Sequence, residues 1–171
     1  MKRREFIAGL GSAAAWPVVA RAQQAAMPVV GVLLLQSADD YKNVTRPFLQ
    51  ALKETGYVVG QNVAVEYRWA ENQLDRLPAL AADLVRRRVA VIVAAGAIAA
   101  VTAKAATTTI PIVFSTGGDP VALGFVASLN RPGANLSGTA VLTTELAPKR
   151  LQLLRQVIPD AVLFGVLADP S

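Results

Sequence analysis

Three short segments contain the groups that could hold a small polar molecule: residues 36–40, 96–97 and 115–119. Each lies between a predicted buried strand and a predicted helix. The free backbone N–H groups at the start of a helix attract anions, including carboxylates, and hydroxyls in these segments add hydrogen-bond donors. The candidate ligand-binding residues are Ser37, Tyr41, Gly96, Ala97, Thr116, Gly117 and Asp119.

Each of these candidates also has a structural role open to it. Asp119 precedes a proline, and an acid followed by proline is typical of the start of a helix. Ser37 could close a turn, and Gly117 could serve turn geometry rather than the close approach of a ligand. Tyr41 is a better candidate for stacking on a ligand than Trp69, because Trp69 ends a predicted strand and is expected to pack.

The residue types that most catalytic sites need are missing from the sequence. It contains no cysteine and no histidine, which excludes disulfides, thiol nucleophiles, histidine bases and the usual ligands of zinc, haem and iron–sulfur clusters. It also lacks a nucleophile elbow, a P-loop, a dinucleotide-binding glycine motif after a strand and the clustered acidic loop of a calcium site. Asp39 and Asp40 are adjacent, so their side chains are expected to point apart. We therefore expect no enzyme, no cofactor and no metal site.

Strands and helices alternate along the predicted fold. Short apolar runs predict strands over residues 29–35, 63–69, 90–95, 110–114, 136–142 and 161–167. Amphipathic stretches predict helices over residues 45–55, 74–88, 98–106, 121–129 and 146–157. This alternation favours an α/β fold with a doubly wound parallel sheet. Ligands bind such sheets beyond the carboxyl ends of the strands, where the three polar segments are expected to lie.

The net charge of +5 does not indicate a nucleic-acid partner. Much of it comes from four basic residues in the first 22; without that segment the chain has 13 basic and 11 acidic residues, a net charge of +2. The one remaining basic run, residues 86–88, closes a predicted helix, where cations oppose the negative end of the helix dipole.

Residues 1–22 have the three parts of an export signal. A charged start is followed by an apolar stretch over residues 6–20 and by an Ala-Arg-Ala cleavage site that ends at Ala22. The stretch is too short and too interrupted for a spanning helix. Residues 3–7 resemble a twin-arginine signal, although an ordinary secretory signal with paired arginines remains open. Since cysteine is absent, no lipid anchor is expected, and the mature protein is predicted to be periplasmic without a stable membrane anchor.

Three stretches of the mature chain, taken together, resemble the sequences of one protein family. The first carries GY, GQN and EYRWA within residues 56–70, and the second carries IPIVF, GDPV and SLNRPGAN within residues 110–135. The third is LAPKRL at residues 146–151. Together they resemble the ABC transporter substrate-binding proteins that include tryptophan- and tyrosine-binding importer components. The similarity covers essentially all of the mature chain.

The resemblance implies two α/β lobes that close over a small solute and deliver it to a membrane permease powered by a separate ATPase. The first lobe would span residues 23–142, and residues 143–171 would begin an incomplete second lobe. Ligand contacts would come from the loops after the first, third and fourth strands, at Ser37, residues 96–97 and residues 116–119. Family members often carry a hydroxyl residue where Ala97 stands, so the solute stays open between an aromatic amino acid and another small carboxylate.

Two other functions remain open at this point. A sensor or partner protein that does not transport solute would have the same fold and site. A small periplasmic enzyme on this fold would need a nucleophile or a base, and the sequence offers only scattered Ser, Thr, Asp, Glu and Lys residues.

Overall fold

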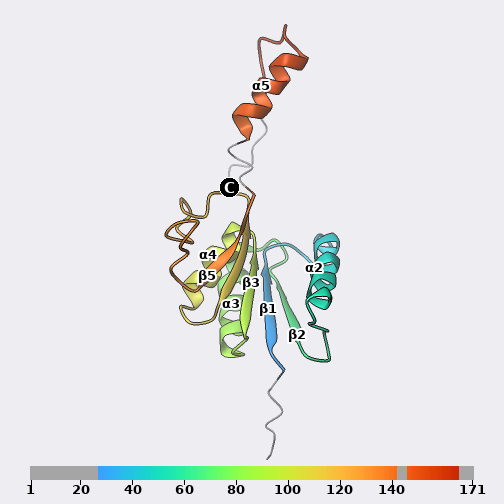
Figure 1. Cartoon of the computed structure of the whole chain (residues 1–171), viewed down its shortest axis with the longest axis vertical. Helices are drawn as coiled ribbons and strands as arrows, with labels where there is room; N and C mark the ends of the chain where they lie inside the picture. Colours follow the sequence, from blue (N-terminus) through green and yellow to red (C-terminus); the bar gives the residue numbers. More distant parts are fainter. Residues whose placement is uncertain (1–26, 142–145, 166–171) are drawn as a thin grey trace, which may run out of the picture.

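The centre of the computed structural model, which describes residues 27–141 and 146–165, is a five-stranded sheet. All four strand pairs are parallel, and the strand order is β2-β1-β3-β4-β5 (Figure 1). The strands are β1 (Val29–Leu34), β2 (Ala64–Trp69), β3 (Val91–Ala95), β4 (Ile112–Thr116) and β5 (Leu136–Ala140). The predicted α/β fold with a parallel sheet is confirmed.

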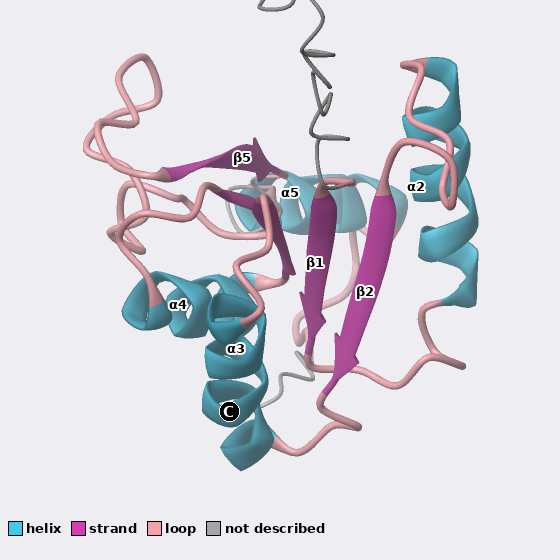
Figure 2. Cartoon of the chain, turned by 90° about the horizontal axis from the view of Figure 1, so that it is seen from below, coloured by secondary structure: helices cyan, strands magenta, loops and turns pink. Residues whose placement is uncertain are grey.

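The helical elements of the described residues are α2 (Lys42–Glu54), the 3₁₀ turn η1 (Leu74–Arg76), α3 (Leu77–Arg86), α4 (Ala97–Ala106) and α5 (Ala147–Val157). Helices α3 and α4 lie on one side of the strands and α2 lies on the other (Figure 2). Helix α5 has no buried residue.

The alternation of side chains along β1 separates two apolar clusters. Leu33 belongs to the larger cluster, which includes the inward residues of α3 and α4. Val32 and Leu34 belong to the smaller one, against which Phe48 of α2 and the aromatic residues of β2 pack. The strand is apolar on both faces because both faces of a parallel sheet are covered.

Gly31 permits the close packing of α3 on β1. A Cβ atom at this position would lie 2.8 Å from Cδ2 of Leu84, which is fully buried. The leucine therefore occupies the space that any side chain at position 31 would need.

Two predicted elements are absent from the described residues. Residues 121–129 form turns rather than a helix, because Asp119 caps a tight turn and Gly124 then takes a left-handed conformation with φ of 67°. This reversal buries Phe125, whose ring lies 5.1 Å from that of Phe114. Residues 161–165 form no strand.

Most elements begin or end one to three residues away from the predicted bounds, and α2 and β4 are the two that affect the candidate site. Helix α2 begins at Lys42 rather than at residue 45, and β4 runs from Ile112 to Thr116 rather than over residues 110–114. The second difference places Thr116 within a strand, which changes the direction of its side chain.

The predicted export signal over residues 1–22 and the predicted lobe boundary between residues 142 and 143 lie wholly or partly outside the described residues. Within residues 27–141 and 146–165, no helix has the length and apolar character needed to cross a membrane.

Candidate functional site

The register of the sheet brings the carboxyl ends of four strands to one level. Leu34 at the end of β1 pairs with Trp69 of β2 and with Ala95 of β3, and Ala95 pairs with Ser115 of β4. The loops that follow these strands therefore lie next to one another; we call this border the carboxyl edge. Because β2 and β3 flank β1 on opposite sides, the strand order reverses there, which is where ligands bind in open α/β sheets.

The loop after β1 is held by its own hydrogen bonds. The Ser37 hydroxyl donates to Oδ2 of Asp40 at 2.6 Å, and the backbone N–H of Asp40 donates back to Ser37 Oγ at 3.3 Å. The hydrogen bond from Ser37 lowers the pKa of the Asp40 carboxyl. Asp39 instead points to Lys42, 2.5 Å away, where both side chains are exposed. The structural role foreseen for Ser37, closing a turn, is the one its hydroxyl has here.

Tyr41 lies at the start of α2 and contacts the aromatic residues of β2. Its ring meets that of Trp69 edge-on at 6.4 Å, and Trp69 stacks on Tyr67 at 5.3 Å with the planes 8° apart. Trp69 thus packs, as expected from its place at the end of a strand. The three residues form an aromatic group that joins α2 to the carboxyl edge.

A cavity of about 200 Å³ lies between α2 and the sheet beside this aromatic group. Tyr41 and Phe48 line it from α2, and Tyr67 and Ser115 line it from the strands. Its wall is almost wholly apolar, and no hydrogen bond within the described residues satisfies the buried Tyr67 hydroxyl. Burial raises the pKa of Tyr67.

Gly96 and Ala97 form the passage from β3 into α4. Gly96 has φ of 94°, a conformation that favours glycine. Its N–H donates to the Ser115 carbonyl at 2.9 Å, which ties this loop to β4. No side chain caps α4, so the backbone N–H groups of its first turn, from Ala97 onward, have no partner within the helix.

The last two residues of β4 carry one exposed hydroxyl and one buried hydroxyl, and the loop follows them. Ser115 is exposed and lies on the α2 side of the sheet. Thr116 is only 6% exposed, and its hydroxyl accepts a hydrogen bond from Gly118 N–H at 3.1 Å. Gly117 is exposed. Asp119 is half-buried and accepts the Val121 N–H at 2.8 Å, so it caps a turn and not the helix that the sequence predicted.

Glu71 and Asn72, in the loop after β2, belong to the carboxyl edge but were not predicted as site residues. Both have left-handed φ angles, 55° and 59°, and non-glycine residues in this conformation often lie at functional sites. Asn72 donates its N–H to the Leu35 carbonyl at 2.8 Å, and its side chain helps lower the pKa of Asp40. Asparagine tolerates this conformation, but nothing in the sequence marks Glu71.

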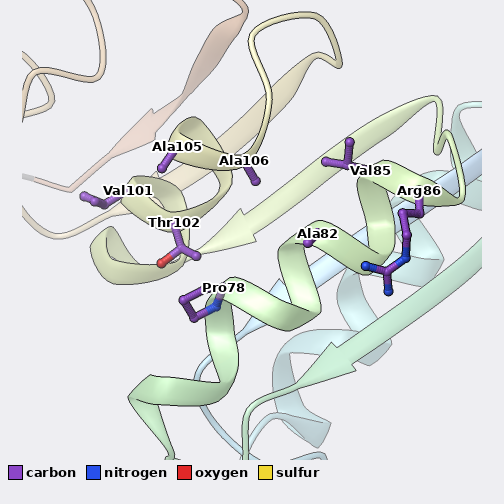
Figure 3. A pocket seen from close by; sticks show the side chains of 8 residues that line it. All are labelled: Pro78, Ala82, Val85, Arg86, Val101, Thr102, Ala105 and Ala106. Carbon is purple, nitrogen blue, oxygen red and sulfur yellow. The ribbon is translucent and has the colours of Figure 1, made fainter.

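A second and larger hollow lies away from these residues, between α3 and α4 (Figure 3). Its volume is about 540 Å³, and none of the predicted ligand-binding residues lines it. Within residues 27–141 and 146–165, no three acidic side chains are grouped so that they could hold a metal ion.

The carboxyl edge therefore offers uncapped backbone N–H groups at the start of α4, the exposed Ser115 hydroxyl and an aromatic group beside an apolar cavity. These groups can hold a small molecule with an apolar part and an anionic part.

A family model for ABC transporter substrate binding proteins matches residues 29–171. A tyrosine-binding protein from Clostridioides difficile (strain R20291) is 30% identical over 142 residues, which are 83% of this chain and 41% of the relative.

Three solved structures are similar to the chain. A substrate-binding protein with adhesive properties from Clostridium difficile, in a ligand-free, open structure, is 29% identical with a TM-score of 0.67, and a conserved domain protein from Vibrio cholerae is 26% identical with a TM-score of 0.70. Each match covers 78% of this chain and 45% of the other. An ABC domain in complex with L-Trp from Streptococcus pneumoniae shares the fold at 23% identity, with a TM-score of 0.61 over 66% of this chain and 38% of that one. The chain spans less than half the length of these relatives.

Proposed function

The chain belongs to the ABC transporter substrate-binding protein family, and on this premise we propose that it captures a small aromatic carboxylate at its carboxyl edge. Members of this family bind a substrate and are not enzymes. An aromatic amino acid is the first candidate, since one relative is a tyrosine-binding protein. Delivery of the solute to a membrane permease is the second part of the proposal.

The observation that carries the proposal is the aromatic group formed by Tyr41, Trp69 and Tyr67 next to the level ends of the strands. Tyr41 lies where the first loop enters α2, so it can contact both a solute in the cavity and the loop itself. Aromatic rings prefer edge-on or offset contacts with one another, and the cavity of about 200 Å³ exceeds the 150 Å³ apolar cavity known to accept benzene.

The carboxylate of the solute would be bound by backbone groups. Ala97 supplies no hydroxyl, but the first N–H groups of α4, which begins directly after β3, have no side-chain cap. The Ser115 hydroxyl is the exposed side-chain donor at the end of β4, whereas Thr116 is buried. We propose that Tyr41 and Ser115 contact the solute directly. The shape of the loops around it would be set by Ser37, Gly96, Gly117 and Asp119.

The test is isothermal titration of the chain with L-tyrosine, L-tryptophan and 4-hydroxyphenylacetate, with L-leucine as the non-aromatic control. Tyr41→Ala is expected to weaken binding by up to about tenfold, since an aromatic pair contributes about 0.5–1.5 kcal/mol. Tyr57→Ala is the matched control, because Tyr57 is exposed and lies outside the cavity lining. Equal affinity for leucine, or equal loss in the two variants, would contradict the aromatic site.

Closure of two lobes over the solute, with residues 23–142 in the first and residues 143–171 beginning the second, is a proposal that rests on the family. Export through a twin-arginine signal over residues 1–22 and a periplasmic location are proposals that rest on the sequence of that segment. N-terminal sequencing of the exported protein is expected to begin at Gln23, directly after Ala22. A chain that retains Met1 after export would contradict the cleavage.

A further inference from the structure

The cavity between α2 and the sheet is lined by one residue whose polar group has no use in the proposed solute site so far. Tyr67 lines this cavity from β2, and its hydroxyl is buried without a hydrogen-bond partner within the described residues. We propose that this hydroxyl selects solutes whose aromatic ring carries a hydroxyl group of its own. This selection rests on the proposed function, because it needs an aromatic solute bound in the cavity.

The unpaired hydroxyl of Tyr67 is a cost to the fold that a different residue would avoid. A buried hydroxyl without a partner is uncommon in folded proteins, because it loses its hydrogen bonds to water and gains none in return. Phenylalanine at position 67 would fill nearly the same space without this cost. Two other polar residues of the lining differ, since Thr45 Oγ1 donates to the Lys42 carbonyl at 3.2 Å and Ser115 is exposed. Tyr67 therefore brings an unused hydrogen-bonding group to a mainly apolar wall.

A second unpaired group lies at the same edge of the sheet. Oε1 of Gln36 is buried without a hydrogen-bond partner, and Gln36 belongs to the loop that follows β1. In the remainder of residues 27–141 and 146–165, no buried side-chain nitrogen or oxygen lacks a partner. The unpaired groups of the described chain are thus confined to the neighbourhood of the proposed solute site, which favours a bound solute as the missing partner.

The depth of Tyr67 in the sheet suits the far end of a solute ring. Tyr67 pairs with Val32, two residues before Leu34 and the level ends of the strands. Two residues of a strand span about 6.6 Å, which is comparable to the length of a hydroxybenzyl group. A solute whose carboxylate lies at the start of α4 would therefore extend its ring hydroxyl toward Tyr67.

The Tyr67 hydroxyl is suited to donate to such a ring. Burial raises the pKa of Tyr67, so the group stays protonated at neutral pH. It can donate to the oxygen of a phenol, or accept the phenol's proton through its own lone pairs. A bare phenyl ring offers no such partner and would leave the Tyr67 hydroxyl unpaired. The site is therefore expected to bind the hydroxylated ring more tightly.

The test is isothermal titration of the full chain with two matched pairs of solutes. L-tyrosine and L-phenylalanine form one pair, and 4-hydroxyphenylacetate and phenylacetate form the other, so the members of each pair differ only in the ring hydroxyl. The wild-type chain is expected to bind the hydroxylated member of each pair about tenfold more tightly, as for one hydrogen bond gained. Tyr67→Phe is expected to abolish this preference and to leave the affinities for L-phenylalanine and phenylacetate unchanged.

Tyr57→Phe is the matched control, because it removes the same hydroxyl from an exposed tyrosine outside the cavity lining. This variant is expected to keep the wild-type preference. If the wild-type chain binds both members of each pair equally, or if Tyr67→Phe keeps the preference or weakens all four solutes alike, then Tyr67 does not select the ring hydroxyl, although the aromatic site itself stands. If none of the four solutes binds more tightly than L-leucine, the proposed function fails and the selection fails with it.

Discussion

A methyl group added at Gly31 is expected to destabilise the fold. The new Cβ would lie 2.8 Å from Cδ2 and 3.1 Å from Cδ1 of Leu84, which is fully buried and held by its neighbours. Overpacking of this kind costs about 1–3 kcal/mol, whereas replacing glycine by alanine restricts the unfolded chain and returns about 0.4–1 kcal/mol. The net loss for Gly31→Ala is therefore about 1–2 kcal/mol.

The same contact predicts the result of a double-mutant cycle. Leu84→Ala alone removes a buried side chain and is expected to cost about 2–5 kcal/mol. In that background the methyl at position 31 no longer meets Leu84 and partly fills the space, so Gly31→Ala should cost nothing further. The two changes should therefore be coupled by about 1 kcal/mol or more.

Urea unfolding followed by circular dichroism measures all four corners of this cycle, and thermal melts give an independent reading. For a chain of this length, 1 kcal/mol corresponds to about 2–4 °C in Tm. If Gly31→Ala is as stable as the wild type, or if the two effects simply add, then Leu84 does not fill the space above Gly31 and the account of α3 packing is wrong.

Three further predictions concern single side chains. Tyr67→Phe removes a buried hydroxyl without a partner, so its unfolding free energy should not fall in urea titration, and a loss above about 1 kcal/mol would indicate a missed hydrogen bond. Asp119→Ala removes the acceptor for Val121 N–H and should cost about 1 kcal/mol, whereas an unchanged Tm would contradict this. Hydrogen bonding from Arg68 lowers the pKa of Asp83, so its contribution is present above the unfolded pKa of about 3.9 and is lost as the pH falls further. Asp83→Asn should therefore flatten the decline of the urea midpoint in acid, and an identical decline in both proteins would refute this.

Local pattern was enough to predict most of the fold and the edge that carries the candidate site. Every residue of the runs 29–35 and 90–95 is apolar, as expected for strands covered on both faces. Once the sheet is parallel, its carboxyl ends must meet at one edge. The prediction of a helix over 121–129 was wrong because Gly124 takes a left-handed conformation and reverses the chain. The spacing of hydrophobic residues does not reveal such a conformation.

The contacts within the site depended on information that the sequence does not contain. The predicted end of β4 was two residues too early, so Thr116 was predicted to be a hydrogen-bond donor in the loop. In the structure Thr116 is the last residue of the strand and its side chain is buried, whereas Ser115 lies on the α2 side. The meeting of Tyr41 with Trp69 follows from the pairing of β2 with β1, and strand order cannot be read from local periodicity. The left-handed pair Glu71 and Asn72 depends on the same pairing, since Asn72 binds the loop after β1.

The level ends of the strands divide the chain into regions with different tolerance to insertion. One residue inserted in β1 would move every following side chain of the strand to the opposite face and exchange the two apolar clusters. One residue inserted between Gln36 and Tyr41 would change only the outline of the carboxyl edge, because the strand ends before it and α2 begins after it. Loop length can thus be varied to accept solutes of other shapes while the sheet that supports the loops stays the same.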